Sequence, residues 1–126
     1  EYLGNEEIIL IVDDVEEQRQ IAKTILKRLN YKVVTVSSGE KAIEFFKNDS
    51  CDIVLLDMIM DPGIDGLETY KRIINLKPDQ KVIIASGFSE SKRVKEAQRL
   101  GVGHYIKKPY SVEKIGITIK EELEEH

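Results

Sequence analysis

The sequence predicts an α/β fold of the doubly wound type, in which helices cover both faces of one parallel sheet. Two observations support this prediction. Short apolar runs rich in Ile, Val and Leu recur along the chain, and amphipathic segments with helical spacing lie between them. Strands that are apolar throughout are typical of a parallel sheet buried on both faces. Five such strands alternating with five helices therefore favour one domain of this class.

The expected strands end where the apolar runs end. They cover residues 8–12, 32–36, 53–56, 81–85 and 104–107. The run at 53–56 is apolar throughout and is followed by Asp57 and then by a Pro62-Gly63 turn. We therefore expect it to be a central strand with Asp57 at its exit. The run at 32–36 alternates and is expected nearer the edge of the sheet.

The expected helices carry an apolar stripe opposite a polar face. They cover residues 15–29, 39–47, 67–76, 89–100 and 112–124. The stripe of the first helix is expected to consist of Ile21, Ala22, Ile25, Leu26 and Leu29. Asp14 is expected to cap this helix. The stretch Ser37-Ser38-Gly39-Glu40 gives a cap signal for the second helix. Ser111 is expected to cap the fifth helix, and Gly101 to end the fourth.

The composition is that of an ordinary globular protein. Of 126 residues, 41% are hydrophobic and 33% are charged, so a substantial core is expected. The net charge of −4 and the scattered basic residues argue against direct binding of nucleic acid. The single cysteine, Cys51, excludes an internal disulfide and a cysteine metal cluster. Because no apolar run could span a membrane and no signal peptide is evident, we expect a cytoplasmic domain without membrane contact.

We expect residues 1–6 to be a linker and residues 7–125 to form the domain. The chain starts at Glu1 and not at Met, which indicates a segment of a longer protein. His126 is interpreted as a tag remnant and is left out of the functional argument.

Polar side chains stand at the exits of the expected strands. In chain order they are Asp13, Asp14, Asp57, Ser86 and Lys108. In the strand order 2-1-3-4-5, the first and third strands are neighbours, so the three carboxylates would share one crevice. Carboxylates held close together repel one another, which favours a divalent cation between them. Oxygen ligands suit Mg²⁺, and the lack of Cys and His at these exits disfavours zinc.

The same exits could receive a phosphoryl group. A single Asp57 would be interpreted as a loop cap, but its expected neighbours favour a nucleophile that forms an aspartyl phosphate. The metal and Lys108 would neutralise charge on the phosphoryl oxygens, and Ser86 could hydrogen-bond to one of them.

The ordered set resembles a response-regulator receiver domain, the phospho-accepting module of two-component signalling. The resemblance covers residues 7–122 and depends on Asp13-Asp14, Asp57, Asp65-Gly66, Ser86-Gly87, Tyr105 and Lys108-Pro109. It implies a flavodoxin-like sheet of order 2-1-3-4-5 with five helices. It also implies a signalling switch that is not a turnover enzyme. A histidine kinase or a histidine phosphotransfer domain would supply the phosphoryl group.

The resemblance further implies roles for individual residues. Asp13, Asp14 and Asp57 would bind Mg²⁺, directly or through water, together with the backbone carbonyl of Ile59. The Lys108-Pro109 bond is expected to be cis. Ser86 would move toward the phosphoryl group and Tyr105 would rotate inward. This change would bias the face made by the fourth helix, fifth strand and fifth helix, through which a homodimer is possible.

The sequence departs from the family pattern after the acceptor. Asp61 separates Met60 from Pro62 and lengthens the loop by one residue; it is expected to be a solvated acid or to contact the metal through water. Ile59 and Phe88 are apolar where a polar side chain could position attacking water. We therefore predict a long-lived aspartyl phosphate.

Partners follow from the resemblance as well. A kinase or phosphotransfer protein would dock near Val15, Gln18 and Ala22 and on the loop after Lys108. The favoured origin is the receiver of a hybrid sensor histidine kinase, with a stand-alone relay protein or the receiver of a transcription factor as alternatives.

The residues also allow other interpretations. An aspartyl-phosphate phosphatase would need a second acid at position 59, where this chain has Ile59. A receiver-like binding module or an intermediate phosphorelay shuttle is the alternative to an output-controlling switch. His104 has no acid nearby in the sequence and is interpreted as a surface or strand residue, and the terminal glutamates 121, 122, 124 and 125 are expected to extend into solvent.

Overall fold

The computed structural model describes residues 3–60, 63–87 and 92–125. The predictions for Asp61, Pro62, Phe88, His126 and the start of the fourth helix lie outside the described residues. Five parallel strands form one sheet in the predicted order, β2-β1-β3-β4-β5. Their bounds are β1 (Ile8–Val12), β2 (Lys32–Val36), β3 (Ile53–Asp57), β4 (Lys81–Ser86) and β5 (His104–Lys107).

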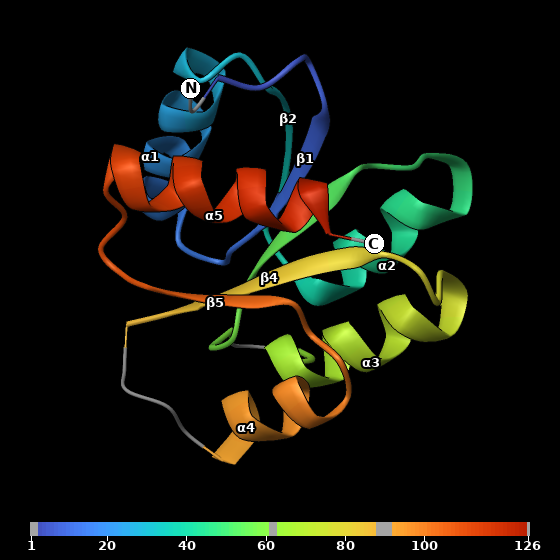
Figure 1. Cartoon of the computed structure of the whole chain (residues 1–126). Coiled ribbons are helices and arrows are strands. Elements are labelled where there is room, and N and C mark those ends of the chain that lie inside the picture. Colours follow the sequence, from blue (N-terminus) through green and yellow to red (C-terminus); the bar gives the residue numbers. More distant parts are fainter. Residues whose placement is uncertain (1–2, 61–62, 88–91, 126) are drawn as a thin grey trace.

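Helices cover both faces of this sheet (Figure 1). Their bounds are α1 (Glu16–Arg28), α2 (Gly39–Asn48), α3 (Gly66–Leu76), α4 (Lys92–Arg99) and α5 (Val112–Glu124). Side chains of α1 and α5 pack in one apolar cluster, whereas those of α2, α3 and α4 pack in another. The predicted doubly wound architecture is confirmed.

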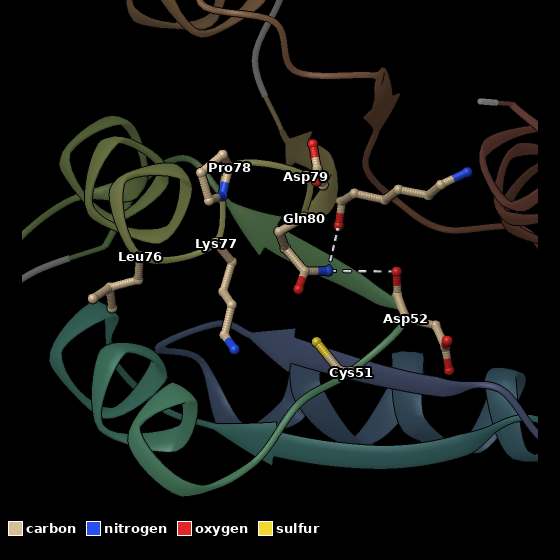
Figure 2. Close-up of a pocket in the computed structure, with 8 residues that line it drawn as sticks. Cys51, Asp52, Leu76, Lys77, Pro78, Asp79 and Gln80 are labelled. Carbon is tan, nitrogen blue, oxygen red and sulfur yellow. Dashed lines mark hydrogen bonds between the residues drawn. The ribbon is translucent and has the colours of Figure 1, made fainter.

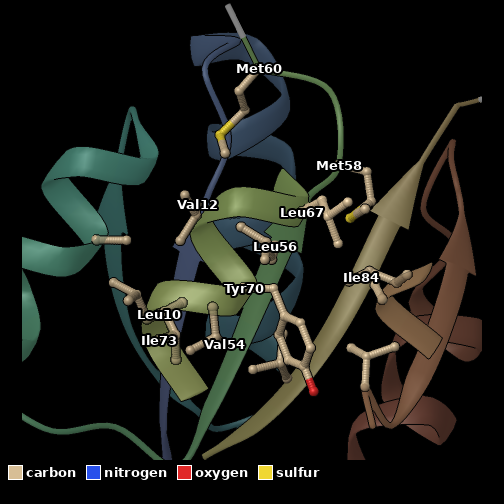
Figure 3. Close-up of a cluster of buried hydrophobic side chains, with 14 of the residues drawn as sticks. Leu10, Val12, Val54, Leu56, Met58, Met60, Leu67, Tyr70, Ile73 and Ile84 are labelled. Atoms are coloured by element: carbon tan, nitrogen blue, oxygen red, sulfur yellow. The ribbon is translucent and has the colours of Figure 1, made fainter. Parts of the chain in front are cut away.

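The two apolar clusters explain why the strands are apolar throughout. Successive side chains of a strand point to opposite faces, so Ile9 and Ile11 of β1 pack with α1 and α5, whereas Leu10 and Val12 pack with α2 and α3. Figure 3 shows the second cluster, in which side chains of β1, β3 and β4 meet those of α3. Apolar side chains cover both faces of the sheet. Polar groups can therefore gather at the carboxyl ends of the strands.

Most of the predicted helix ends are confirmed. The Ser38 Oγ accepts a hydrogen bond from the Lys41 N–H, and the Ser111 Oγ accepts one from the Lys114 N–H. Gly101 follows α4 with a φ of 111°, a conformation that favours glycine over other residues. These ends fix where each helix leaves the sheet.

Two predictions for the first helix are wrong. Its N-cap is Val15, whose apolar side chain cannot accept a capping hydrogen bond. The Val15 N–H donates to the Asp13 Oδ1 at 3.0 Å. The prediction that Asp14 caps this helix is therefore not met. Ile21 is 41% exposed, since the buried stripe runs along Ala22, Leu26 and Leu29.

The segment before β1 is bonded to the turn after α1. The Gly4 N–H donates to the Leu29 carbonyl at 2.6 Å, and the Glu6 N–H donates to the Asn30 carbonyl at 2.9 Å. The boundary between linker and domain at residue 7 stays a prediction. Among the described residues, no helix combines the length and apolar character needed to cross a membrane.

Candidate functional site

Three carboxylates meet at the carboxyl end of the sheet. β1 and β3 are parallel neighbours with Val12 opposite Leu56, which places Asp13 beside Asp57. One oxygen from each of Asp13, Asp14 and Asp57 lies within 4.8 Å of the others. The expected acidic crevice is therefore present.

The three carboxylates differ in their surroundings. Asp57 is 7% exposed and Asp13 is also buried, whereas Asp14 is more exposed than either. The Asp13 backbone carbonyl accepts a hydrogen bond at 2.8 Å from Nη1 of Arg19, one turn into α1. Arg19 therefore holds the exit of β1 against α1, a role that no local sequence signal had indicated.

Lys108 is the cation of the site. Its Nζ lies 2.7 Å from Oδ2 of Asp13 and 3.4 Å from Oδ1 of Asp57. Its backbone N–H donates to the Ser86 carbonyl at 2.8 Å, which joins the exits of β4 and β5. The Lys108-Pro109 peptide bond is cis, as the resemblance implied. Lys108 thus lies across both buried carboxylates.

The electrostatics of the site favour an additional cation. Burial raises the pKa of Asp57 from its usual 3.8 to about 6; the Lys108 ammonium opposes this rise and the Asp13 carboxylate adds to it. One ammonium therefore does not compensate the carboxylates around it. All three side chains offer oxygen atoms, the ligands that Mg²⁺ prefers, so the residues present fit a magnesium ion.

The loop after Asp57 is held on both sides. The Met58 N–H donates to the Ala85 carbonyl, and the Gly66 N–H donates to the Met58 carbonyl. A Cβ at Gly66 would lie 2.5 Å from the carbonyl oxygen of Asp57, so only glycine allows this approach of α3. The Ile59 N–H lies 3.5 Å from the Asp57 Oδ1, at the limit of a hydrogen bond. The proposed metal contact of the Ile59 carbonyl stays a prediction.

The remaining predicted residues lie where the strand exits place them. Ser86 is buried as the last residue of β4. Gly87 follows it, with no atom within 4 Å of an added Cβ. Tyr105 in β5 is partly buried against the cluster that contains α4. The structure thus brings Ser86 to the acidic edge and leaves Tyr105 between core and surface.

Sequence reasoning missed two long-range pairs. Asp65 Oδ1 accepts the Glu68 N–H at the start of α3, and its Oδ2 lies 2.5 Å from Nη2 of Arg93 in α4. Glu122 is only 6% exposed, so its predicted extension into solvent is wrong, and His104 Nδ1 lies 2.5 Å from its Oε1. A usable signal existed, since Glu122 is seven residues after the buried Ile115 and falls on the same helix face.

A pocket of about 370 Å³ lies near the amino ends of β3 and β4, beside Cys51, Asp52 and residues 76–81 (Figure 2). Gln80 Nε2 donates across it to the Asp52 and Lys81 carbonyls. Burial raises the pKa of the Cys51 thiol to about 12, which disfavours the reactive thiolate. This pocket offers no reactive thiol and is separate from the acidic crevice.

Comparison with known proteins gives a consistent family. A family model described as response regulator receiver domain matches residues 9–120. Chemotaxis protein CheY of Thermotoga maritima is 32% identical, over 85% of this chain and 89% of that protein. Sporulation initiation phosphotransferase F of Bacillus subtilis is 31% identical, over 93% of this chain and 94% of that protein.

A similar solved structure is the response regulator protein TrrA of Thermotoga maritima in complex with Mg(2+)-BeF. It is 31% identical with a TM-score of 0.82, covering 93% of this chain and 99% of that one. Several other curated relatives are longer, and the chain spans 27% to 48% of their lengths. Receiver domains are not turnover enzymes. The chain belongs to the response regulator receiver domain family of two-component signalling.

Proposed function

We propose that this receiver domain accepts a phosphoryl group on Asp57 and thereby changes the partners that it binds. The observation that carries the proposal is the position of Asp57, buried at the end of β3 with a lysine and two further carboxylates around it. A structural cap would need none of these neighbours.

Asp13, Asp14 and Asp57 would hold Mg²⁺, with the backbone carbonyl of Ile59 as the further protein ligand. The raised pKa of Asp57 and the all-oxygen donor set support this assignment. The related TrrA was solved in complex with Mg(2+)-BeF, which also supports it. Bound Mg²⁺ would neutralise charge on the phosphoryl oxygens.

Asp57, Lys108 and Ser86 would each have a separate role in the transfer of the phosphoryl group. A carboxylate oxygen of Asp57 attacks the phosphorus of a phosphohistidine, an oxygen–phosphorus bond forms, and the nitrogen–phosphorus bond breaks. The imidazole leaves with the bonding electron pair and takes up a proton. Lys108 would exchange its contact with Asp13 for a phosphoryl oxygen, and the Ser86 hydroxyl would donate to another. The burial of Asp57 would limit the access of water to the product.

Ser86 and Tyr105 would carry the signal away from the site. Tyr105 lies in β5 against the cluster that contains α4, so a shift of Ser86 would alter the α4-β5-α5 face. A homodimer through this face is one possible output. This is a population shift produced by a local change of charge.

The donor would be a histidine kinase or a histidine phosphotransfer domain. The docking prediction for α1 needs one correction, because Ala22 is fully buried and cannot contact a partner. Val15 and Ile21 are exposed apolar residues at the start of α1 and within it. Val112, which follows Lys108 in the chain, is a third exposed apolar residue. These side chains are better candidates for the docking surface.

An intermediate in a phosphorelay is the second candidate function. It is favoured by the similarity to sporulation initiation phosphotransferase F over nearly the full length of both chains. The two candidates differ in whether the phosphoryl group passes on to a second histidine protein. The longer relatives include a transcriptional regulatory protein and a cyclic di-GMP phosphodiesterase, so the origin in a hybrid kinase stays a prediction.

The test is incubation with acetyl phosphate and Mg²⁺, followed by intact mass measurement. We expect one phosphoryl adduct on the wild-type chain, none after chelation of Mg²⁺ and none on Asp57→Asn. Asp49→Asn is the matched control, because Asp49 is an exposed aspartate outside the crevice, and it should label like the wild type. An adduct that persists in Asp57→Asn would disprove the proposal.

A further inference from the structure

A second cluster of metal-ligating side chains lies where β5 begins and α5 ends. His104 Nδ1 is 2.5 Å from Oε1 of the buried Glu122. His104 Nε2 is 3.4 Å from Oε2 of Glu125 and 3.7 Å from Oε1 of Glu121, which are both exposed. The imidazole therefore has a buried carboxylate on one nitrogen and two accessible carboxylates on the other.

This arrangement fixes the tautomer of the neutral imidazole. A carboxylate oxygen only accepts hydrogen bonds, so the contact with Glu122 requires the proton on Nδ1 of His104. The lone pair is then on Nε2, the nitrogen that lies 3.7 Å from Glu121 Oε1 and 3.4 Å from Glu125 Oε2. A histidine that ligates a metal through one nitrogen commonly donates its other N–H to a carboxylate in this way.

The spacing of the outer atoms also matches a metal site. In tetrahedral zinc sites with bonds of about 2.0–2.2 Å, neighbouring ligand atoms are about 3.4 Å apart. The Nε2–oxygen distances of 3.4 Å and 3.7 Å are close to this value without any metal imposing them. The ligand atoms of His104, Glu122 and Glu125 also lie within 4.8 Å of one another.

The local charge favours a cation. Within the described part of the chain, the ion pairs of Glu121, Glu122 and Glu125 all involve His104. Lys81 lies at the same helix end, but its Nζ donates to backbone carbonyls, including those of Glu122 and Leu123. The carboxyl end of α5 adds further negative potential. With a neutral His104, Lys81 would be the only cation that the described residues place at this helix end, against three carboxylates.

The backbone is built around the buried carboxylate. A Cβ on Gly103 would overlap with Oε1 of Glu122, so a larger residue before His104 would displace the end of the Glu122 side chain from this pair. The contact between His104 and Glu122 is therefore a defined packing arrangement and not a chance meeting of two surface side chains.

We propose that His104, Glu121 and Glu125 form a binding site for a divalent transition metal, with Zn²⁺ the best match, and that Glu122 is a positioning residue. One imidazole nitrogen with two carboxylate oxygens suits zinc better than magnesium. The site lies at the opposite end of the strands from Asp57 and does not depend on the proposed phosphorylation. Bound metal would join β5 to the last turn of α5.

The test is a Zn²⁺ titration of the whole chain in excess Mg²⁺, followed by calorimetry and by NMR of the imidazole nitrogens. The wild type should bind one Zn²⁺ with a shift of the His104 Nε2 signal. His104→Asn should lose this binding event. His126→Ala is the matched control, since the chain has two histidines, and it should keep the event.

Further variants separate ligation from folding. Glu125→Gln changes an exposed side chain and should weaken Zn²⁺ binding at least tenfold in a chain of normal circular dichroism. Glu122→Gln should weaken it by roughly 10–100-fold and change the tautomer ratio of His104 in the metal-free chain. Absence of saturable binding, binding of equal strength in His104→Asn, or an unshifted Nε2 signal would overturn the proposal.

Discussion

At the scale of single residues, Asp57 brings a carboxylate into a site with too little positive charge. Its pKa of about 6 lies above its usual 3.8, mainly because it is buried. Between these pH values, the folded chain retains a proton on Asp57 that the unfolded chain has lost. The stability contributed by this proton is present below pH 4 and is lost as the pH rises through 6.

The first prediction concerns this loss. Without metal, the free energy of unfolding of the wild type should fall by about 2 kcal/mol between pH 4 and pH 7 relative to Asp57→Asn, after allowance for partial solvation. The side-chain amide introduced in that variant cannot ionise, so the titrating groups that do not interact with Asp57 cancel in the comparison. Urea unfolding at several pH values measures the difference. If the free energy of unfolding of the two proteins changed with pH in the same way, the raised pKa assigned to Asp57 would be contradicted.

A second prediction at this scale concerns water. The Ile59 side chain is 53% exposed beside the acceptor, and it offers no hydrogen bond to orient an attacking water. Replacing Ile59 with Asn and Phe88 with Glu should speed phosphate loss about tenfold, a change of about 1.4 kcal/mol in the barrier. The time course of the phosphorylated mass measures this rate.

The control for that experiment is Leu76→Asn. Leu76 is 49% exposed at the end of α3, far along the chain from the acceptor, so the same kind of substitution should leave the rate of phosphate loss unchanged. Unchanged or slower phosphate loss in the Ile59 and Phe88 double variant would contradict the prediction that apolar residues protect the aspartyl phosphate from water.

At the scale of elements, the start of α3 sets the shape of the acceptor loop. The Asp65 carboxylate caps α3 and pairs with Arg93 of α4, which connects two helices of the same face. Gly66 brings the first turn of α3 against the backbone of Asp57 and Met58. The close approach of α3 to this backbone therefore depends on the glycine at position 66.

The third prediction tests this contact. Gly66→Ala should destabilise the chain by about 1–3 kcal/mol, because its Cβ would meet backbone atoms that have little room to move. The matched substitution Gly87→Ala should change the free energy of unfolding by less than about 0.5 kcal/mol, since its Cβ meets open space. Urea unfolding compares the two. Equal losses of stability would show that the approach of α3 is not tight.

At the scale of the whole molecule, the arrangement of the sheet could be predicted from the sequence. The apolar strands and their polar exits are local patterns, and parallel connection brings all the exits to one edge. The meeting of Asp13, Asp14 and Asp57 followed from that rule and from the strand order.

The rest could not be predicted because it depends on distant contacts. Ile21 is apolar and lies next to the buried Ala22, so helical spacing alone could not place the edge of the buried stripe. His104 and Glu122 are 18 residues apart and meet only because α5 packs beside β5. The N-cap of α1 is Val15 and not Asp14, a position that depends on the geometry of the first turn, where Asp13 accepts the Val15 N–H.

The central claim, that Asp57 receives the phosphoryl group, is tested most directly by locating the modified residue. Borohydride reduces an aspartyl phosphate to homoserine, and peptide mass spectrometry then identifies the position. After treatment with acetyl phosphate and Mg²⁺, we expect homoserine at position 57 alone, and none when Mg²⁺ is chelated. Homoserine at position 13, 14 or 61 in place of 57 would contradict the account.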